Sequence, residues 1–344
     1  MSRLARLQAA LEEPLLVTNL VNVRYLTGFE SSNVAIFVEP ERTRLFTDFR
    51  YASAARRVDG VETVEIERNL LAGIARKLDG RVGFEAATVT YAGYETLRGG
   101  SLELVPRRGL VERLRAVKDE LELDRIRKAA AISDGVFERL AAERFIGRAE
   151  RELVWRIIEL FHEEGADEPG FDAIVGAGPT GSVPHAHPGD RTIGPGETIV
   201  IDLGARLGGY TSDCTRTFAT GELPGRLREA YEVCRRAQQA GLDAVRAGVA
   251  GRDADAAARE VVEASPFAGR FGHGLGHGVG LEVHEAPNLR PESEDVLEPG
   301  NVVTVEPGIY LEGEGGIRIE DLVVVTEDGC EILTRFTKEL VSVD

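Results

Sequence analysis

The chain has 344 residues, of which 43% are hydrophobic and 29% charged, and its formal net charge at pH 7 is −17. This length allows two domains with ample cores, and the composition is that of an ordinary globular protein. The negative charge disfavours nucleic acid and anionic lipid as partners. No apolar run reaches membrane-spanning length, so we do not expect a membrane partner either.

The N-terminal stretch and the cysteines indicate a cellular compartment. The stretch MSRLARLQAALEEP predicts a short amphipathic helix and lacks the apolar core of a secretory signal. Cys214, Cys234 and Cys330 are odd in number and widely separated, which argues against a disulfide framework. Because both features suit a reducing environment, we expect a cytoplasmic protein.

The first part of the chain alternates short strand and helix patterns. Residues 33–38 and 43–47 are predicted strands on either side of a turn that contains Pro40. Residues 48–58 then predict a helix, and residues 81–85 predict another strand. This alternation indicates a small α/β domain.

A long amphipathic helix marks the start of a second domain. The composition shifts near residues 112–118, and we therefore divide the chain into domains 1–114 and 115–344. A second helix is predicted over 149–165, with Trp155 among its core positions. The apolar stripe of the first, long helix consists of Leu123, Ile126, Ala130, Val136, Phe137 and Leu140.

Beyond residue 170 the pattern changes to strands separated by glycine turns. The β-rich segments are FDAIVGAG, ETIVIDLGARLGGYTSDCTRTF, NVVTVEPGIY and GGIRIEDLVVV. Helical patterns over roughly 225–247 and 252–264 lie between them. Such interleaving predicts an α+β domain with a largely antiparallel sheet.

The segment HGLGHGVGLEVHE, residues 273–285, holds half of the chain's six histidines, namely His273, His277 and His284. Each interior glycine costs a helix about 1 kcal/mol, so the alternate glycines exclude a helix here. We predict extended chain, in which alternate residues from 273 to 281 share one face and the glycines allow close approach of backbone or ligand. Taken alone, the segment also fits a glycine-rich loop with surface histidines.

Acids interrupt otherwise apolar strand patterns. Asp202, Asp213 and Glu306 each lie in a different predicted strand, and Glu320 and Asp321 lie in a fourth. One such acid commonly faces solvent, but acids in four separate strands are harder to explain in this way. Several buried carboxylates repel one another and raise one another's pKa unless a cation lies among them.

The available cations are Arg216, Arg318 or a bound metal. Oxygen-rich ligation with one or two imidazoles suits divalent Mn, Co, Fe or Zn. Four carboxylates are more than one ion needs, so we expect two divalent metal ions roughly 3.5–4 Å apart that share acids and a water. Such a pair supplies hydroxide near neutral pH and stabilises the oxyanion formed in amide hydrolysis.

These segments together resemble the pita-bread metallopeptidase family, which includes methionine aminopeptidase, aminopeptidase P, Xaa-Pro dipeptidase (prolidase) and the metal-free creatinase. VTNLVNVRYLTGF and FTDFRY are similar to a creatinase-like N-terminal domain, so the resemblance spans the chain. The family motifs are an Asp in a D-L-G strand, an Asp eleven residues later, a His in H-G-x-G-H-G, a Glu in V-E-P-G and a Glu in I-R-I-E-D. The matching residues here are Asp202, Asp213, His277, Glu306 and Glu320.

The resemblance implies an α+β pita-bread catalytic domain and a role for each matched residue. Asp202 would chelate one metal ion, with Mn the first candidate, whereas Asp213 and Glu320 would bridge two ions. His277 and Glu306 would complete the shell of one ion, and Glu306 would also handle the proton of the attacking bridging hydroxide.

Four further residues are implied in the reaction. His185, His273 and His284 would line the pocket and contact the substrate and its tetrahedral intermediate, with His284 as a proton shuttle. Arg318 would support the metal ligands through hydrogen bonds. Relatives are commonly homodimers, so the resemblance also implies a homodimer.

The choice within the family depends on the segment VHEAPNLRP. An N-terminal domain disfavours methionine aminopeptidase, and the intact ligand set disfavours creatinase, which leaves small peptides with proline at the second position as substrates. Archaeal-type prolidases carry an arginine soon after V-H-E that can pair with a dipeptide's carboxylate. Asn288 occupies that position here, and Arg290 lies two residues later. The sequence therefore favours aminopeptidase P, with prolidase as the alternative and a non-enzymatic pita-bread binding module as a more remote one.

Overall fold

The computed structural model describes residues 1–343, and the chain forms two compact units. The first unit is Met1–Arg115, and the second begins at Ala116. Each unit has hydrophobic core clusters of its own.

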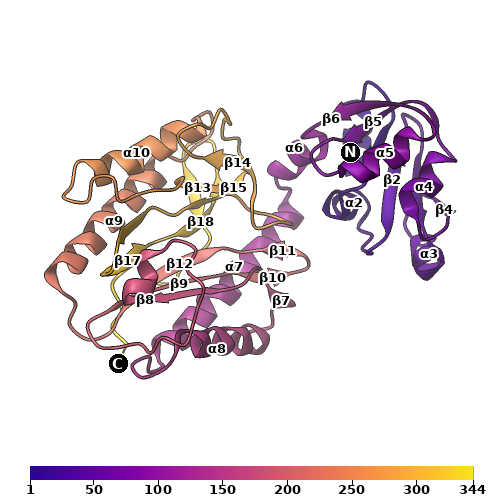
Figure 1. Cartoon of the computed structure of the whole chain (residues 1–344). Helices are drawn as coiled ribbons and strands as arrows, with labels where there is room; N and C mark the ends of the chain where they lie inside the picture. The colour runs from indigo at the N-terminus through magenta and orange to yellow at the C-terminus, as the bar shows by residue number, and fades with distance from the viewer. Residues whose placement is uncertain (344) are drawn as a thin grey trace. The chain divides into compact units, whose positions relative to one another are not determined.

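The first unit is built on one sheet. Its strands are β1 (Leu15–Val17), β2 (Val34–Val38), β3 (Thr43–Thr47), β4 (Glu62–Glu65), β5 (Asp79–Glu85) and β6 (Ser101–Arg107). They follow the order β4-β3-β2-β1-β5-β6, and four of them, β2, β4, β5 and β6, are labelled in Figure 1. β1, β2 and β3 are antiparallel neighbours, whereas β4, β5 and β6 each join a parallel neighbour.

Short helices are interspersed with these strands along the chain. They are α1 (Arg3–Ala9), α2 (Leu20–Thr27), α3 (Phe49–Ala55), α4 (Leu70–Ala75), α5 (Tyr91–Arg98) and α6 (Leu110–Ala116). The predicted elements at 33–38, 43–47, 48–58 and 81–85 are confirmed as β2, β3, α3 and β5. The boundaries follow from local chemistry, since Asp48 caps α3 by accepting a hydrogen bond from the Arg50 N–H.

Four long helices belong to the second unit: α7 (Glu120–Ala141), α8 (Glu150–Glu163), α9 (Gly225–Ala244) and α10 (Gly251–Glu263). Asp119 begins α7 with a capping box that includes Glu122. All six residues of the predicted α7 stripe are buried. Nowhere in residues 1–343 does a helix combine the length and the apolar character that crossing a bilayer requires.

The strands of the second unit pair antiparallel, as predicted, but they form several small sheets rather than one. The first half of the unit contributes β7 (Glu168–Pro169), β8 (Ile174–Ala177), the short helix η1 (Gly178–Ser182), β9 (Thr198–Leu203), β10 (Ala205–Leu207), β11 (Tyr210–Thr211) and β12 (Cys214–Ala219). The second half contributes β13 (Gly276–Gly278), β14 (Glu285–Leu289), β15 (Val302–Val305), β16 (Gly308–Leu311), β17 (Gly315–Arg318), β18 (Asp321–Val325) and β19 (Cys330–Ile332).

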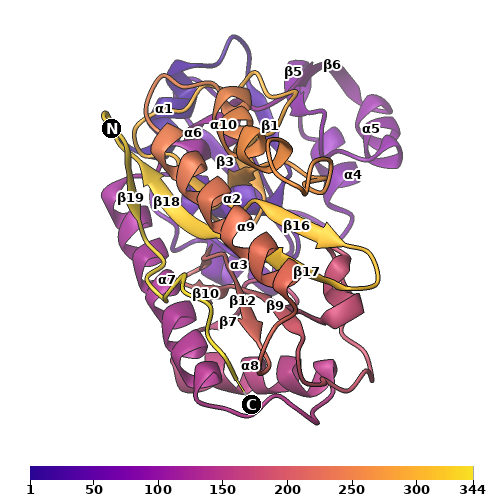
Figure 2. The ribbon, with the colours of Figure 1, turned by 90° about the vertical axis from the view of Figure 1, so that its left-hand side faces the viewer.

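The helices of the second unit lie in two pairs, one for each half. α7 contacts β10 and β11, and α8 contacts β8, so this pair covers the first half. α9 and α10 pack against each other and contact the strands of the second half (Figure 2).

The prediction that Trp155 belongs to the core is wrong, because this residue is 66% exposed. The buried residues of α8 include Leu153, Ile157, Leu160 and Phe161, which recur at helical spacing. At about 100° per residue, Trp155 lies roughly 200° around the helix from Leu153 and therefore faces solvent. The apolar character of Trp155 led to the wrong prediction, whereas the helical period places this side chain on the exposed face.

This exposure generates a stability prediction. Trp155→Ala should change the free energy of unfolding by less than about 0.5 kcal/mol, because it removes few buried contacts. Phe161→Ala, at a buried position of the same helix, should cost about 3–5 kcal/mol. Urea unfolding followed by circular dichroism measures both. Equal losses in the two variants would contradict the assigned helix face.

Candidate metal centre

A cavity of about 470 Å³ lies in the second unit. Every residue that the sequence assigned to the site lines it, although these residues come from distant parts of the chain. They are His185, Asp202, Asp213, His273, His277, His284, Glu306, Arg318 and Glu320. The fold therefore brings the predicted set together around one space.

The expected placement of four acids within four strands is wrong for three of them. Asp202 lies inside β9, but Asp213, Glu306 and Glu320 lie in the short breaks before β12, after β15 and before β18. At such breaks the ladder stops, so the backbone can turn a carboxylate into the cavity. The Glu306 N–H still donates to the Leu275 carbonyl at 2.8 Å, so interrupting the strand leaves it with a partner.

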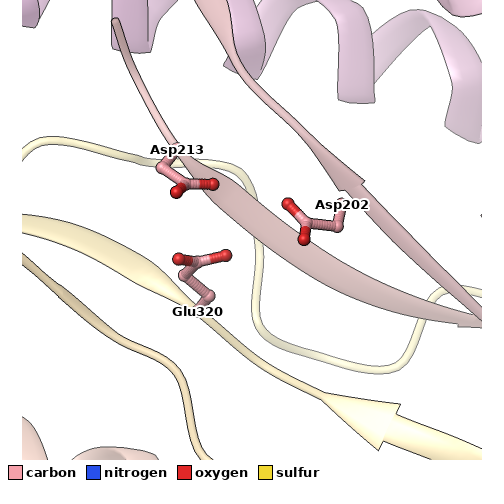
Figure 3. A group of neighbouring side chains, drawn as sticks. All are labelled: Asp202, Asp213 and Glu320. Atoms are coloured by element: carbon pink, nitrogen blue, oxygen red, sulfur yellow. The ribbon is translucent and has the colours of Figure 1, made fainter. Parts of the chain in front are cut away.

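Three carboxylates form a tight group at the base of the cavity. One oxygen from each of Asp202, Asp213 and Glu320 lies within 4.8 Å of the other two (Figure 3). Asp213 and Glu320 are only 5% and 1% exposed. Burial, followed by repulsion from the neighbouring carboxylates, raises the pKa of both residues well above the ordinary value. A group of this kind strongly favours a bound cation.

His277 and Glu306 extend the group. The Nε2 atom of His277 lies 3.4 Å from Glu306 Oε1 and 3.7 Å from Asp213 Oδ2. Its Nδ1 atom lies 3.1 Å from the Gly278 carbonyl oxygen, which can only accept, so Nδ1 carries a hydrogen. In neutral His277, Nε2 therefore directs its lone pair at the acids, as a metal ligand must. Burial opposes ionisation of Glu306, but in metal-free protein with protonated His277, Nε2 donates to Glu306, and this hydrogen bond and the charge of His277 lower the pKa of Glu306 to about 2.

The glycines beside His277 allow close approach of backbone, as predicted. β13 lies between β14 and β15. A Cβ atom at Gly276 would overlap the Thr304 carbonyl oxygen, and one at Gly278 would overlap the carbonyl of Ala286. The neighbouring chains therefore pack directly against this strand.

The expectation that alternate residues from 273 to 281 share one face is wrong. His273 and His277 line the cavity, whereas Leu275 and Val279 are fully buried. The strand β13 covers only three residues, and its register with β14 shifts between His277 and the next glycine. This irregularity ends the two-residue alternation on which the expectation was based.

Arg318 supports the first carboxylate. Its guanidinium is buried and donates from Nη2 to Asp202 Oδ2 at 2.7 Å. Nε donates to the hydroxyl of Thr215 at 3.0 Å, and that hydroxyl donates to Glu320 Oε2 at 2.7 Å. Arg318 thus fixes Asp202 directly and Glu320 through one threonine.

Tyr310 is a site residue that sequence reasoning missed. Its hydroxyl accepts from Arg318 Nη1 at 3.0 Å and lies 2.9 Å from Nε2 of His273. Since Nδ1 of His273 lies 2.8 Å from the Gly274 carbonyl oxygen, neutral His273 carries its hydrogen there and accepts from Tyr310 at Nε2. The available signal was a tyrosine in an apolar strand directly after V-E-P-G, because a buried hydroxyl requires a partner.

Two further histidines lie at the rim. His284 and His185 are exposed yet line the cavity, and the ring centroids of His284 and His277 are 4.2 Å apart. Burial of the ring, followed by the nearby His277, lowers the pKa of His284. The rim therefore offers a neutral imidazole beside the acid group at pH 7.

The donor set fits divalent metal ions. Among the residues that the structure describes, Asp202 Oδ1 is buried without a hydrogen-bond partner, although its other oxygen is held by Arg318. A buried carboxylate oxygen without a donor is costly unless a cation contacts it. Four carboxylates and one imidazole are hard and borderline donors that suit metals such as Mn, Co, Fe or Zn.

Comparison with known families identifies the fold. Residues 124–327 match metallopeptidase family M24, and residues 3–117 match the creatinase/prolidase N-terminal domain. The chain belongs to metallopeptidase family M24. An uncharacterized peptidase of Bacillus subtilis is 38% identical to this M24 chain over 334 residues, covering 95% of both chains.

Two solved structures extend the comparison. A Xaa-Pro dipeptidase from Bacillus anthracis has a TM-score of 0.95 at 36% identity and covers 99% of each chain. An X-Pro aminopeptidase from Thermotoga maritima has a TM-score of 0.89 at 32% identity and covers 98% of this chain and 100% of its own. The expected pita-bread fold with a creatinase-like N-terminal domain is confirmed, and so is the expectation of a metallopeptidase.

The crowded carboxylates generate a prediction for the metal-free M24 protein. Asp213 and Glu320 have raised pKa values when folded, so the folded state holds protons that the unfolded chain releases. The free energy of unfolding of the metal-free protein should therefore fall as the pH rises above the unfolded carboxyl pKa of about 4. Asp213→Asn removes one of the repelling charges. Without metal, this variant should therefore have a higher melting temperature than wild type at pH 7.

Thermal unfolding with a chelator, and again with Mn²⁺, measures this balance. Wild type should gain stability from the metal, whereas Asp213→Asn should gain less because it has lost one carboxylate ligand. A metal-free variant that melts below the parent at pH 7 would show that carboxylate repulsion is not the dominant effect.

Proposed function

We propose that this protein is a Xaa-Pro dipeptidase, a prolidase, that hydrolyses the bond ahead of proline with the help of two divalent metal ions. The sequence favoured aminopeptidase P because Asn288 replaces an expected arginine. The relatives support the dipeptidase better, since the Bacillus anthracis dipeptidase exceeds the Thermotoga maritima aminopeptidase in both identity and TM-score. The main structural support for a dipeptide substrate is the position of Arg290.

The place of Arg290 in the cavity wall suits a dipeptide substrate. Asn288 is the cross-strand partner of His277, and Arg290 follows two residues later, directly after the end of β14, where it lines the same cavity. Two residues of extended chain span about 7 Å, which is the length of one dipeptide. A substrate whose scissile carbonyl lies beside His277 would therefore place its carboxylate near the guanidinium of Arg290.

The chemistry of Arg290 supports this role. Its side chain is exposed and lines the cavity. Within residues 1–343 its guanidinium has no carboxylate partner, unlike most other arginines of the chain. An unpaired guanidinium at the mouth of an acidic cavity attracts a substrate carboxylate and can hold it through two hydrogen bonds.

By the family resemblance, Asp202, Asp213, His277, Glu306 and Glu320 would together hold the two ions. When bound, the ions supply a nucleophile at neutral pH and neutralise the oxyanion of amide hydrolysis. Manganese, a homodimeric assembly and a cytoplasmic location belong to the same proposal and rest on the resemblance and the cysteine pattern.

The chain's own residues move the protons. Glu306 is ionised at neutral pH, so its carboxylate can accept a proton from the attacking water. His284 is neutral at the rim and can carry a proton towards the leaving proline nitrogen. His273 is held by Tyr310 and Gly274 and forms a fixed wall for the substrate.

An assay of the purified protein tests the proposal. With Mn²⁺ or Co²⁺, turnover is expected on Xaa-Pro dipeptides and to a much smaller extent on Xaa-Pro-Xaa peptides. Asp213→Ala and Glu320→Ala should abolish turnover, because each removes a bridging ligand. Selective cleavage of the longer peptides would establish aminopeptidase P, and no turnover of either class would favour a binding module. Substantial activity in either variant, with unchanged metal content, would overturn the ligand assignment.

Arg290 generates a sharper prediction on peptide length. Arg290→Met should lower kcat/KM for Xaa-Pro dipeptides by roughly 10–100-fold, since a charge-assisted pair contributes about 1.5–3 kcal/mol. The same change should leave the C-terminally amidated dipeptide, which has no carboxylate, almost unaffected. Arg252→Met, at an exposed arginine of α10 outside the cavity, is the matched control. Equal losses on the acid and the amide would refute a carboxylate contact.

A further inference from the structure

A buried ion pair lies behind the loop that carries His284. Lys118 Nζ is 3.4 Å from Glu285 Oε2, and the two side chains are only 1% and 6% exposed. Neither residue lines the cavity. Two charges are costly to bury, so this pair requires a specific explanation.

Lys118 is held by the chain that leads to the metal centre. Its N–H donates to the Gly300 carbonyl at 2.9 Å, and Val117 pairs with Asn301 in an isolated bridge. Those two partners immediately precede β15, and Glu306 directly follows the end of that strand. The backbone of Lys118 is therefore bonded to the residues at the start of β15, and the proposed ligand Glu306 follows the end of that strand.

Glu285 holds the turn that precedes His284. Its Oε1 accepts the Glu282 N–H at 3.0 Å, and Gly280 donates its own N–H to the Glu282 carbonyl at 3.0 Å. A Cβ atom at Gly280 would lie 2.7 Å from the Glu285 carboxylate, so glycine leaves the space this carboxylate occupies. The carboxylate thus closes residues 280–285 into a compact turn.

We propose that Lys118 and Glu285 are positioning residues for His284. Glu285 fixes the turn through its contact with Glu282, and Lys118 neutralises that carboxylate and connects it to the strand leading to Glu306. The result is the 4.2 Å approach of His284 to His277. An apolar pair could fill the same volume, but it could not accept the Glu282 N–H. This inference rests on the proposed proton-transfer role of His284.

The first experiment measures how readily the turn at residues 280–285 opens, and it does not depend on enzymatic activity. Hydrogen–deuterium exchange of a peptide covering residues 279–286, in metal-free protein, reports whether the turn opens. Glu285→Gln and Lys118→Met should both speed exchange there, and the control Glu294→Gln should not. Glu294 is an exposed carboxylate nearby that does not line the cavity. Unchanged exchange in both test variants would overturn the proposal.

The second experiment asks whether the pair acts through His284. Glu285→Gln and Lys118→Met should each lower kcat/KM on Xaa-Pro dipeptides roughly tenfold or more, as mutations of residues that orient a site do. Adding Glu285→Gln to Lys118→Met should restore part of the activity, because it removes the buried charge that has lost its ammonium partner. With His284→Ala already present, Glu285→Gln should change kcat/KM by less than about twofold. If the losses in kcat/KM of Glu285→Gln and His284→Ala multiply instead, the ion pair has a general structural role and the proposal is wrong.

Failure of the inference can be told apart from failure of the proposed function. If wild type hydrolyses no Xaa-Pro dipeptide, the dipeptidase assignment fails, and the exchange experiment still decides whether the ion pair holds the turn. If wild type is active and the effects multiply, the assignment stands and the positioning role falls.

Discussion

The second unit is organised around carboxylates that repel one another. Asp213 and Glu320 are almost fully buried, and Asp202 completes a group whose oxygens lie within 4.8 Å. Such a group is unfavourable without a cation, because burial and like charge both penalise ionisation. The surrounding polar contacts do not remove this repulsion; they hold it in a fixed geometry. A binding site for divalent metal is the physical consequence, and its cost to the metal-free fold is a common feature of functional sites.

A network of hydrogen bonds holds these carboxylates in place. Arg318 holds Asp202, Tyr310 joins Arg318 to His273, and Thr215 joins Arg318 to Glu320. Each bond satisfies a buried polar group while fixing the direction of a side chain that faces the cavity. The ion pair of Lys118 with Glu285 repeats this logic at the rim, where a turn rather than a strand must be held.

Much of the site could be predicted from the sequence because its chemistry is locally encoded. Acids in apolar segments and histidines between alternating glycines indicated metal chemistry, and the motifs carried the family resemblance. The errors were also local. Trp155 was assigned to the core by its apolar character, and Asp213 to a strand that in fact breaks at that residue. Strand boundaries and solvent exposure depend on neighbours that a sequence window does not contain.

The sequence by itself determined the residue types, their spacing and therefore the chemistry available to this protein. Only the tertiary structure decided which side chains meet. Arg290 lies two residues beyond the position expected of the arginine, directly after β14 ends, yet it lines the cavity. Tyr310 and Lys118 carried no motif, and their partners Arg318 and Glu285 are 8 and 167 residues away. Tyr310 meets Arg318 across the hairpin of β16 and β17, whereas Lys118 meets Glu285 through packing of the whole unit, which no local pattern specifies.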